Sequence, residues 1–235
     1  MEKLIRFTIA DLAKITNHRS GEIKFGQKMH TIPKDKDIAE YIKTCEAPYV
    51  LFGIPEDIGV RANYGRPGAA SAWKSAIKSI ANIQHNRFCK GSRILVLGTL
   101  DVHDRMEAVK DLDFNKIDER MKLSQMVAEI DKDVAHIIFT IVSAGKIPIV
   151  IGGGHNNAYG NIKGTALAKG KPINAINFVT HSISKPCGCY FLLLFSPRAL
   201  LLKRIFKQNK IWSDFFGDIP SKIIPITPFN IFSAK

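Results

Sequence analysis

Short runs of apolar residues recur through the middle of this sequence and are separated by stretches of mixed character. The runs are rich in valine, isoleucine and leucine and end near glycine or proline, a pattern that predicts buried β-strands. These predicted strands cover residues 47–54, 93–98, 147–151 and 173–178.

Between the predicted strands, apolar residues recur at helical spacing. Residues 69–83 place them three and four positions apart, which predicts an amphipathic helix. Residues 117–144 continue such a pattern for longer, and Gly145 follows where a helix end favours glycine. A helix of about ten residues is predicted after Asn156. The N-terminal forty residues give only weak signals.

The alternation of apolar strands with amphipathic helices predicts an α/β fold. Such strands form a parallel sheet that helices cover on both faces. Ligands of these sheets gather at the carboxyl ends of the strands. His155 follows the strand at 147–151, and His181 follows the strand at 173–178. We therefore expect both histidines at one edge of the sheet.

Composition and charge narrow the possible functions of the 235-residue chain. The net charge is +13, but the basic excess within residues 1–178 is dispersed, without a basic helix or aromatic-basic motif, so we expect no nucleic-acid partner. The four cysteines are scattered and suggest no disulfide framework, which predicts a cytoplasmic protein. The start of the chain has no uninterrupted apolar core of the kind that a signal peptide requires.

The character of the sequence changes after residue 178. The segment that follows is aperiodic, and its only acids are Asp214 and Asp218. Its longest apolar run is interrupted by Pro197 and Arg198 and is too short to cross a membrane, so we expect no membrane partner. We predict two parts, an α/β domain at 1–182 and a divergent basic and apolar tail at 183–235.

Several separate motifs follow one another in a characteristic order. They are GIPEDIGVRANYGRPGA at 53–69, NIQHNRF at 82–88, LVLGTLDV at 95–102 and IPIVIGGGHNNAYG at 147–160. Together they resemble the arginase or ureohydrolase family, and most of all its bacterial formimidoylglutamase-type members. The resemblance covers residues 45–182. It implies a three-layer α/β/α fold with a mostly parallel sheet, which would be incomplete at its C-terminal side.

The resemblance also implies a metal site and a reaction. Family members hydrolyse a linear C–N bond of an amidine or guanidine, such as that of N-formimidoyl-glutamate, through a hydroxide that bridges two Mn²⁺ ions. By match to the motifs, His155 and His181 would each serve one metal ion. Val179 and Ile183 stand where the family has metal-binding carboxylates. Because two Mn²⁺ ions need anionic ligands to offset their repulsion, we expect weak or absent Mn²⁺ binding.

Two readings of the function therefore remain open. The chain is either a metallohydrolase of impaired or lost activity, or a non-catalytic truncated remnant that serves as an interaction module. If it is active, its partner is a small amidine or guanidine, and the chain could form a homo-oligomer. Arg61 and Asn63, in a glycine-rich loop, are candidates for substrate binding. Glu56 and Asp57 either support the site from behind or belong to a solvated turn.

Overall fold

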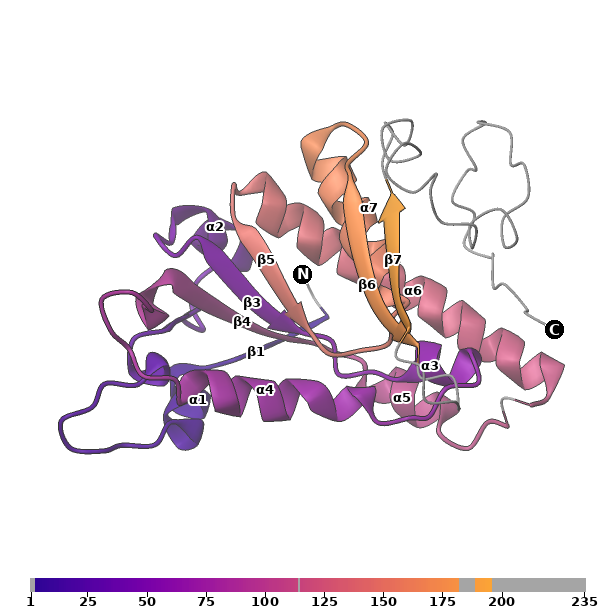
Figure 1. Cartoon of the computed structure of the whole chain (residues 1–235), viewed down its shortest axis with the longest axis horizontal. Helices are drawn as coiled ribbons and strands as arrows, with labels where there is room; N and C mark the ends of the chain where they lie inside the picture. Colours follow the sequence, from indigo (N-terminus) through magenta and orange to yellow (C-terminus); the bar gives the residue numbers. More distant parts are fainter. Residues whose placement is uncertain (1–2, 114, 182–188, 196–235) are drawn as a thin grey trace. The chain divides into compact units, whose positions relative to one another are not determined.

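The computed structural model describes residues 3–113, 115–181 and 189–195 (Figure 1). The chain forms two compact units, Met1–Gly170 and Lys171–Lys235. The strands of the first unit are β1 (Leu4–Arg6), β2 (His30–Thr31), β3 (Tyr49–Gly53), β4 (Ile94–Leu100) and β5 (Ile147–Ile151).

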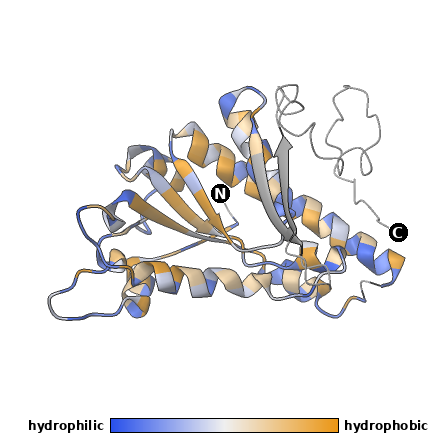
Figure 2. Ribbon diagram, in the orientation of Figure 1, coloured by the Kyte–Doolittle hydropathy of each residue, from blue (hydrophilic) through white to orange (hydrophobic). Residues whose placement is uncertain are grey.

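Three parallel strands, β4, β3 and β5, make up most of the first unit's sheet. Strand β3 lies between β4 and β5 and is parallel to both. The other edge of β4 is shared by two short strands, β1 in antiparallel and β2 in parallel orientation. The central strands are the most uniformly hydrophobic part of the unit (Figure 2). The predicted α/β fold with a mostly parallel sheet is thus confirmed.

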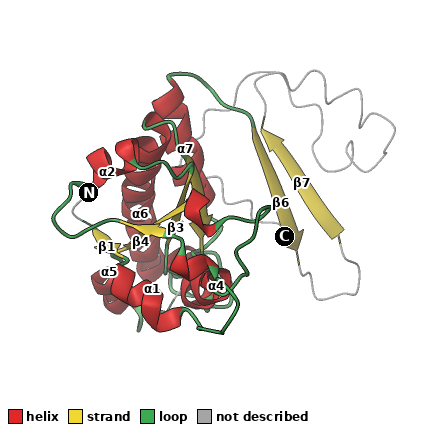
Figure 3. Ribbon diagram, turned by 90° about the vertical axis from the view of Figure 1, so that its left-hand side faces the viewer, coloured by secondary structure: helices red, strands yellow, loops and turns green. Residues whose placement is uncertain are grey.

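Helices cover both faces of this sheet (Figure 3). Successive residues of a strand point to opposite faces, and β3 follows this rule. Val50 and Phe52 belong to one hydrophobic core, whereas Leu51 belongs to the other.

The α-helices are α1 (Ile9–Ile15), α2 (Ile38–Thr44), α3 (Ile58–Ala62), α4 (Ala72–Ala81), α5 (His103–Val109), α6 (Ile117–Ser143) and α7 (Asn157–Lys169). The short 3₁₀ helices are η1 (Phe25–Gln27), η2 (Ala69–Ser71) and η3 (Gly91–Arg93).

The two cores are built by different helices. Helices α1 and α4 supply the smaller core, and α4 does so with Trp73, Ile77 and Ala81, which are four residues apart. Helices α2, α3, α5 and α6 supply the larger core on the opposite face. The helices predicted at 69–83 and 117–144 are confirmed, and the second ends before Gly145, whose φ of +74° suits glycine.

Two glycines allow α7 to pack closely against α6. A Cβ atom added to Gly164 would lie 2.4 Å from the carbonyl oxygen of Ala135 and 2.8 Å from the Cβ of Ile138. A Cβ added to Gly160 would lie 2.8 Å from the side chain of Val134. Since a backbone oxygen cannot move aside as a side chain can, the contact at Gly164 requires glycine.

We expect Gly164→Ala to destabilise the protein by about 1–3 kcal/mol, because it forces α7 away from α6. Helix propensity alone predicts the opposite sign, a gain of about 1 kcal/mol. Urea denaturation of the variant measures the difference. Lys169→Ala, at an exposed position of the same helix, serves as the control, and equal stability of the two variants would contradict the packing argument.

The predicted strand at 173–178 exists, but its pairing differs from the expected one. It forms β6 (Ala175–His181), which pairs antiparallel with β7 (Cys189–Phe195) in a separate two-stranded sheet. The expectation that it continues the parallel sheet is therefore wrong for the described pairing. Residues 189–195, which we assigned to an aperiodic tail, are apolar and aromatic and thus suited to a strand. The rest of the predicted tail lies outside the described residues.

Candidate functional site

The loops that follow β3 and β5 meet at one edge of the sheet. The two strands are parallel and in register, with Gly53 opposite Ile151. The pairing continues one step further, because the Ile54 N–H donates to the Ile151 carbonyl at 3.0 Å. Residues 54–57 and 152–156 therefore leave the sheet side by side, at the carboxyl ends where ligand sites of such sheets form.

Glu56 joins these two loops from a fully buried position. Its Oε2 accepts a hydrogen bond from the backbone N–H of Ile58 at 2.7 Å. Its Oε1 accepts from the N–H of Gly154 at 2.8 Å and from the Nδ2 of Asn157 at 2.6 Å. A solvated turn is therefore excluded for this residue, and Glu56 holds the loops after β3 and β5 together.

The glycine loop after β5 can adopt its conformation only with glycine at two positions. Gly152 and Gly153 have φ angles of +88° and +81°, which residues with a Cβ rarely adopt. A Cβ on Gly153 would also lie 2.1 Å from the Nδ2 of Asn157, the group that donates to Glu56. Gly153 thus leaves room for the side-chain amide of Asn157. The hydrogen bond from this amide to Glu56 therefore requires the glycine loop.

Asp57 is also buried and ties down the loop that follows α3. Its Oδ1 accepts a hydrogen bond from the Nε of Arg61 at 3.0 Å, and its Oδ2 accepts from the N–H of Gly68 at 2.8 Å. Arg61 also donates from Nη1 to the carbonyl of Lys110 at 3.1 Å. Arg61 therefore has a structural role in this loop. Asn63 is exposed at the end of α3, and the substrate roles suggested for both residues stay predictions.

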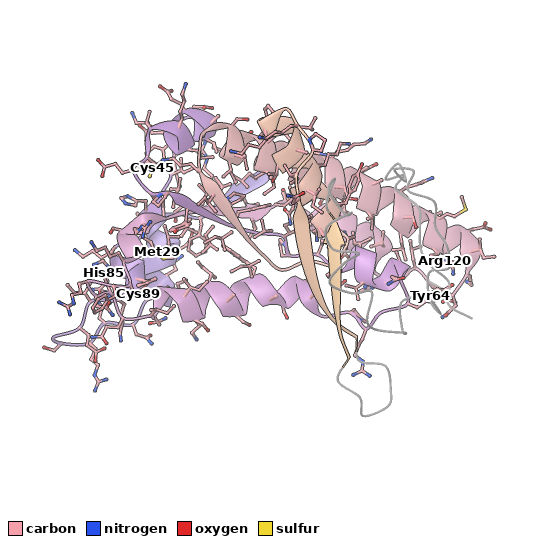
Figure 4. All side chains as sticks on the ribbon, turned by 45° about the horizontal axis from the view of Figure 1, so that its top comes forward. Met29, Cys45, Tyr64, His85, Cys89 and Arg120 are labelled. Carbon is pink, nitrogen blue, oxygen red and sulfur yellow. The ribbon has the colours of Figure 1, made fainter. Side chains whose placement is uncertain are left out.

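A strained tyrosine in the same loop was not foreseen from the sequence. Tyr64 has a φ of +55°, in the left-handed region that only glycine enters easily. The guanidinium of Arg120, on α6, lies 4.9 Å from the centre of its ring, and both side chains are labelled in Figure 4. This cation–π contact joins the loop after α3 to helix α6. No local sequence signal marks the pair, since its members are far apart along the chain.

His155, the first predicted metal ligand, is exposed in the glycine loop just before α7. Val179 and the second predicted ligand, His181, lie in β6, whereas Ile183 lies outside the described residues. The expected meeting of the two histidines at one edge of a sheet stays a prediction.

The described residues do not fit a binuclear manganese site. Glu56 is the buried carboxylate beside the glycine loop, but N–H donors occupy both of its oxygens, so it has a structural rather than a metal-binding role. Among the described residues, no group of three or more histidine, cysteine, aspartate or glutamate side chains could hold a metal ion. The same part of the chain has no helix that is long and apolar enough to cross a membrane.

A comparison with protein-family models identifies the class of protein to which this chain belongs. The model of the arginase family matches residues 47–182, and the chain belongs to this family.

Within this family, the chain is similar to several proteins named formimidoylglutamase. A formimidoylglutamase from Chromobacterium violaceum is 33% identical over 133 residues, which cover 56% of this chain and 35% of that protein. A formimidoylglutamase from Geobacillus kaustophilus is 30% identical over 162 residues, which cover 68% of this chain and 44% of that protein. The chain thus matches less than half of the length of these curated relatives. No solved structure matches it.

Proposed function

We propose that this chain descends from formimidoylglutamase-type hydrolases and that its manganese site is impaired. The observation that supports this proposal is that some site motifs of the family are kept in this chain and others are replaced. The match includes the glycine loop with His155, yet Val179 and Ile183 occupy positions where the resemblance implies carboxylates. The substrate class would be a linear amidine such as N-formimidoyl-glutamate, with agmatine or arginine as less favoured guanidines.

The chemistry of Mn²⁺ explains why this contrast matters. Mn²⁺ prefers carboxylate oxygen, and a site of two divalent ions needs protein anions to reduce the repulsion between them. The two histidines that remain are neutral ligands. We therefore propose little or no turnover, and the chain's alternative role is that of a non-catalytic remnant or interaction module. A cytoplasmic location and a homo-oligomeric state complete the proposal.

The experiment is an assay, with added Mn²⁺, of formamide or ammonia release from N-formimidoyl-glutamate and of urea release from agmatine. We expect the rate to lie at least about a thousandfold below that of the Geobacillus kaustophilus relative assayed beside it, because two charged groups of the site are lost. Turnover at a rate near that of the relative would refute the impairment. Complete absence of turnover would favour the non-catalytic role.

A further inference from the structure

Three buried polar side chains belong to helices α6 and α7, which pack against each other. The backbone of α7 touches Asp131 there, since a Cβ added to Gly160 would lie 3.0 Å from the Asp131 carbonyl oxygen. The Oδ1 of Asp131 is buried and has no hydrogen-bond partner within the described structure. The Oδ1 atoms of Asn157 and Asn161, one turn apart on α7, are in the same situation.

These three unpaired atoms on α6 and α7 are acceptors, as is the Oδ1 of Asn156 just before α7, whereas the unpaired buried donor among the described residues is the Nη1 of Arg105 on α5. Buried polar atoms are nearly always hydrogen-bonded, because an unpaired acceptor costs about 1–3 kcal/mol. The Nδ2 of Asn157 already donates to Glu56, so its amide cannot turn round to offer a donor. A proton on Asp131 is a donor that this arrangement lacks.

The electrostatics around Asp131 favour such a proton. Burial, and after it the negative charge of Glu56, raises the pKa of Asp131 to about 7, and Lys163 on α7 opposes this rise only in part. The other charged groups on the neighbouring elements have partners of their own. Arg105 on α5 pairs with Asp133 and Glu129, and Arg61 on α3 pairs with Asp57.

We propose that Asp131 is a positioning residue whose carboxyl, when protonated, secures the bridge between Glu56 and the loop that carries His155. Protonated Asp131 removes a like charge that acts on Glu56 and offers one O–H donor on the side of α6 that packs against α7. Ionised Asp131 leaves two carboxylates near each other and the amide oxygens unpaired. The role of His155 as a metal ligand rests on the proposed function, whereas the proton uptake by Asp131 does not.

The sign of the effect follows from linkage. Asp131 has a pKa of about 7 in the folded state and an ordinary value of 3.8, so between these pH values the folded state binds more protons than the unfolded state. Stability is therefore highest near the lower value, falls as pH rises towards 7, and is level above it. Because Asp131 is only partly buried, we expect a fall in the folding equilibrium constant of about tenfold, far less than the full shift implies.

Two readouts on the full chain test the proposal. The first is the urea midpoint at pH values from 5 to 9. The second is the NMR signal of the Ile58 amide, which donates to Glu56 and is remote in sequence from the ring of His155. We expect both to show an inflection near pH 7 in the parent, and Asp131→Asn to abolish it. Asp118→Asn, at an exposed position of α6, is the matched control and should leave the inflection unchanged.

A second variant keeps the test decisive if Asp131→Asn folds poorly. Lys163→Gln removes the charge that lowers the pKa of Asp131, so its inflection should move to higher pH. An Ile58 signal without inflection in the parent would overturn the proposal, and so would an inflection that survives Asp131→Asn or does not move in Lys163→Gln. Neither readout uses substrate or metal, so the outcome is independent of the turnover assay.

Discussion

Replacing Glu56 with glutamine is expected to lower the free energy of unfolding by about 3 kcal/mol or more, because a charged and buried acceptor of several hydrogen bonds is lost. Glutamine has nearly the same size, so the loss is one of hydrogen bonding and not of volume. One carboxylate oxygen becomes an NH₂ group. It would then face N–H donors, either those of Ile58 and Gly59 on one side or those of Gly154 and Asn157 on the other.

Glu46→Gln is the matched control for this variant. Glu46 is exposed at the end of α2, so the same chemical change should alter the stability by no more than about 0.5 kcal/mol. Urea denaturation of the two variants beside the parent gives both values. If Glu56→Gln were as stable as Glu46→Gln, the carboxylate would not join the loops after β3 and β5, and the description of the site would have to change.

Amide hydrogen exchange shows which hydrogen bonds are lost in Glu56→Gln. The N–H groups of Ile58 and Gly154 are protected by Glu56, so in Glu56→Gln their exchange should be faster even where the rest of the sheet stays protected. This local loss distinguishes removal of the bridge from a general weakening of the fold.

The central strands and helices were predictable because their patterns are long and unambiguous. The strand at Ile147–Ile151 was predicted with the observed bounds, and the helix at Ile117–Ser143 to within one residue. The N-terminal helices were missed because they are short and their apolar stripes are brief. A signal for α1 was present, since Thr8 and Asp11 form a capping box at its start, and Asp37 caps α2 in a similar way.

The site was predictable only in part, for a physical reason. Gly152, Gly153 and His155 are adjacent in sequence, so a motif reveals them. The partners of the loop are not adjacent, since Glu56 lies about a hundred positions before Asn157. Only the side-by-side packing of β3 and β5 brings these residues together. The position of Asp131 against α7 likewise depends on the glycines of α7 and could not be inferred from helix 117–144 alone.

The pairing of the strand predicted at 173–178 was wrong for a related reason. An apolar strand has no mark that tells a parallel from an antiparallel neighbour, and the alternation with helices upstream favoured a parallel one. The run at Cys189–Phe195 offers a partner that is close in sequence, and hairpin pairing needs only a short connection.

The second large effect concerns the proposed impairment of the metal site, which should be reversible in part by restoring charge. Val179→Asp combined with Ile183→Asp would return two carboxylates to the positions that the resemblance assigns to metal binding. Carboxylate oxygen is the donor that Mn²⁺ prefers, and two anions would offset the repulsion of a second ion. We expect a gain in Mn²⁺ affinity of at least about tenfold. Catalysis should remain slight, because Asp214 and Asp218 are the only further acids of this sequence after residue 183.

The most direct test of the proposed impairment is therefore a Mn²⁺ titration followed by the electron paramagnetic resonance signal of the free ion. The parent, the double aspartate variant and a Val179→Asn, Ile183→Asn control are compared, and the control introduces polarity of similar size without charge. We predict weak binding by the parent and the control and clearly tighter binding by the aspartate variant. Tight binding of two Mn²⁺ ions by the parent, or equal affinity of all three proteins, would contradict the account.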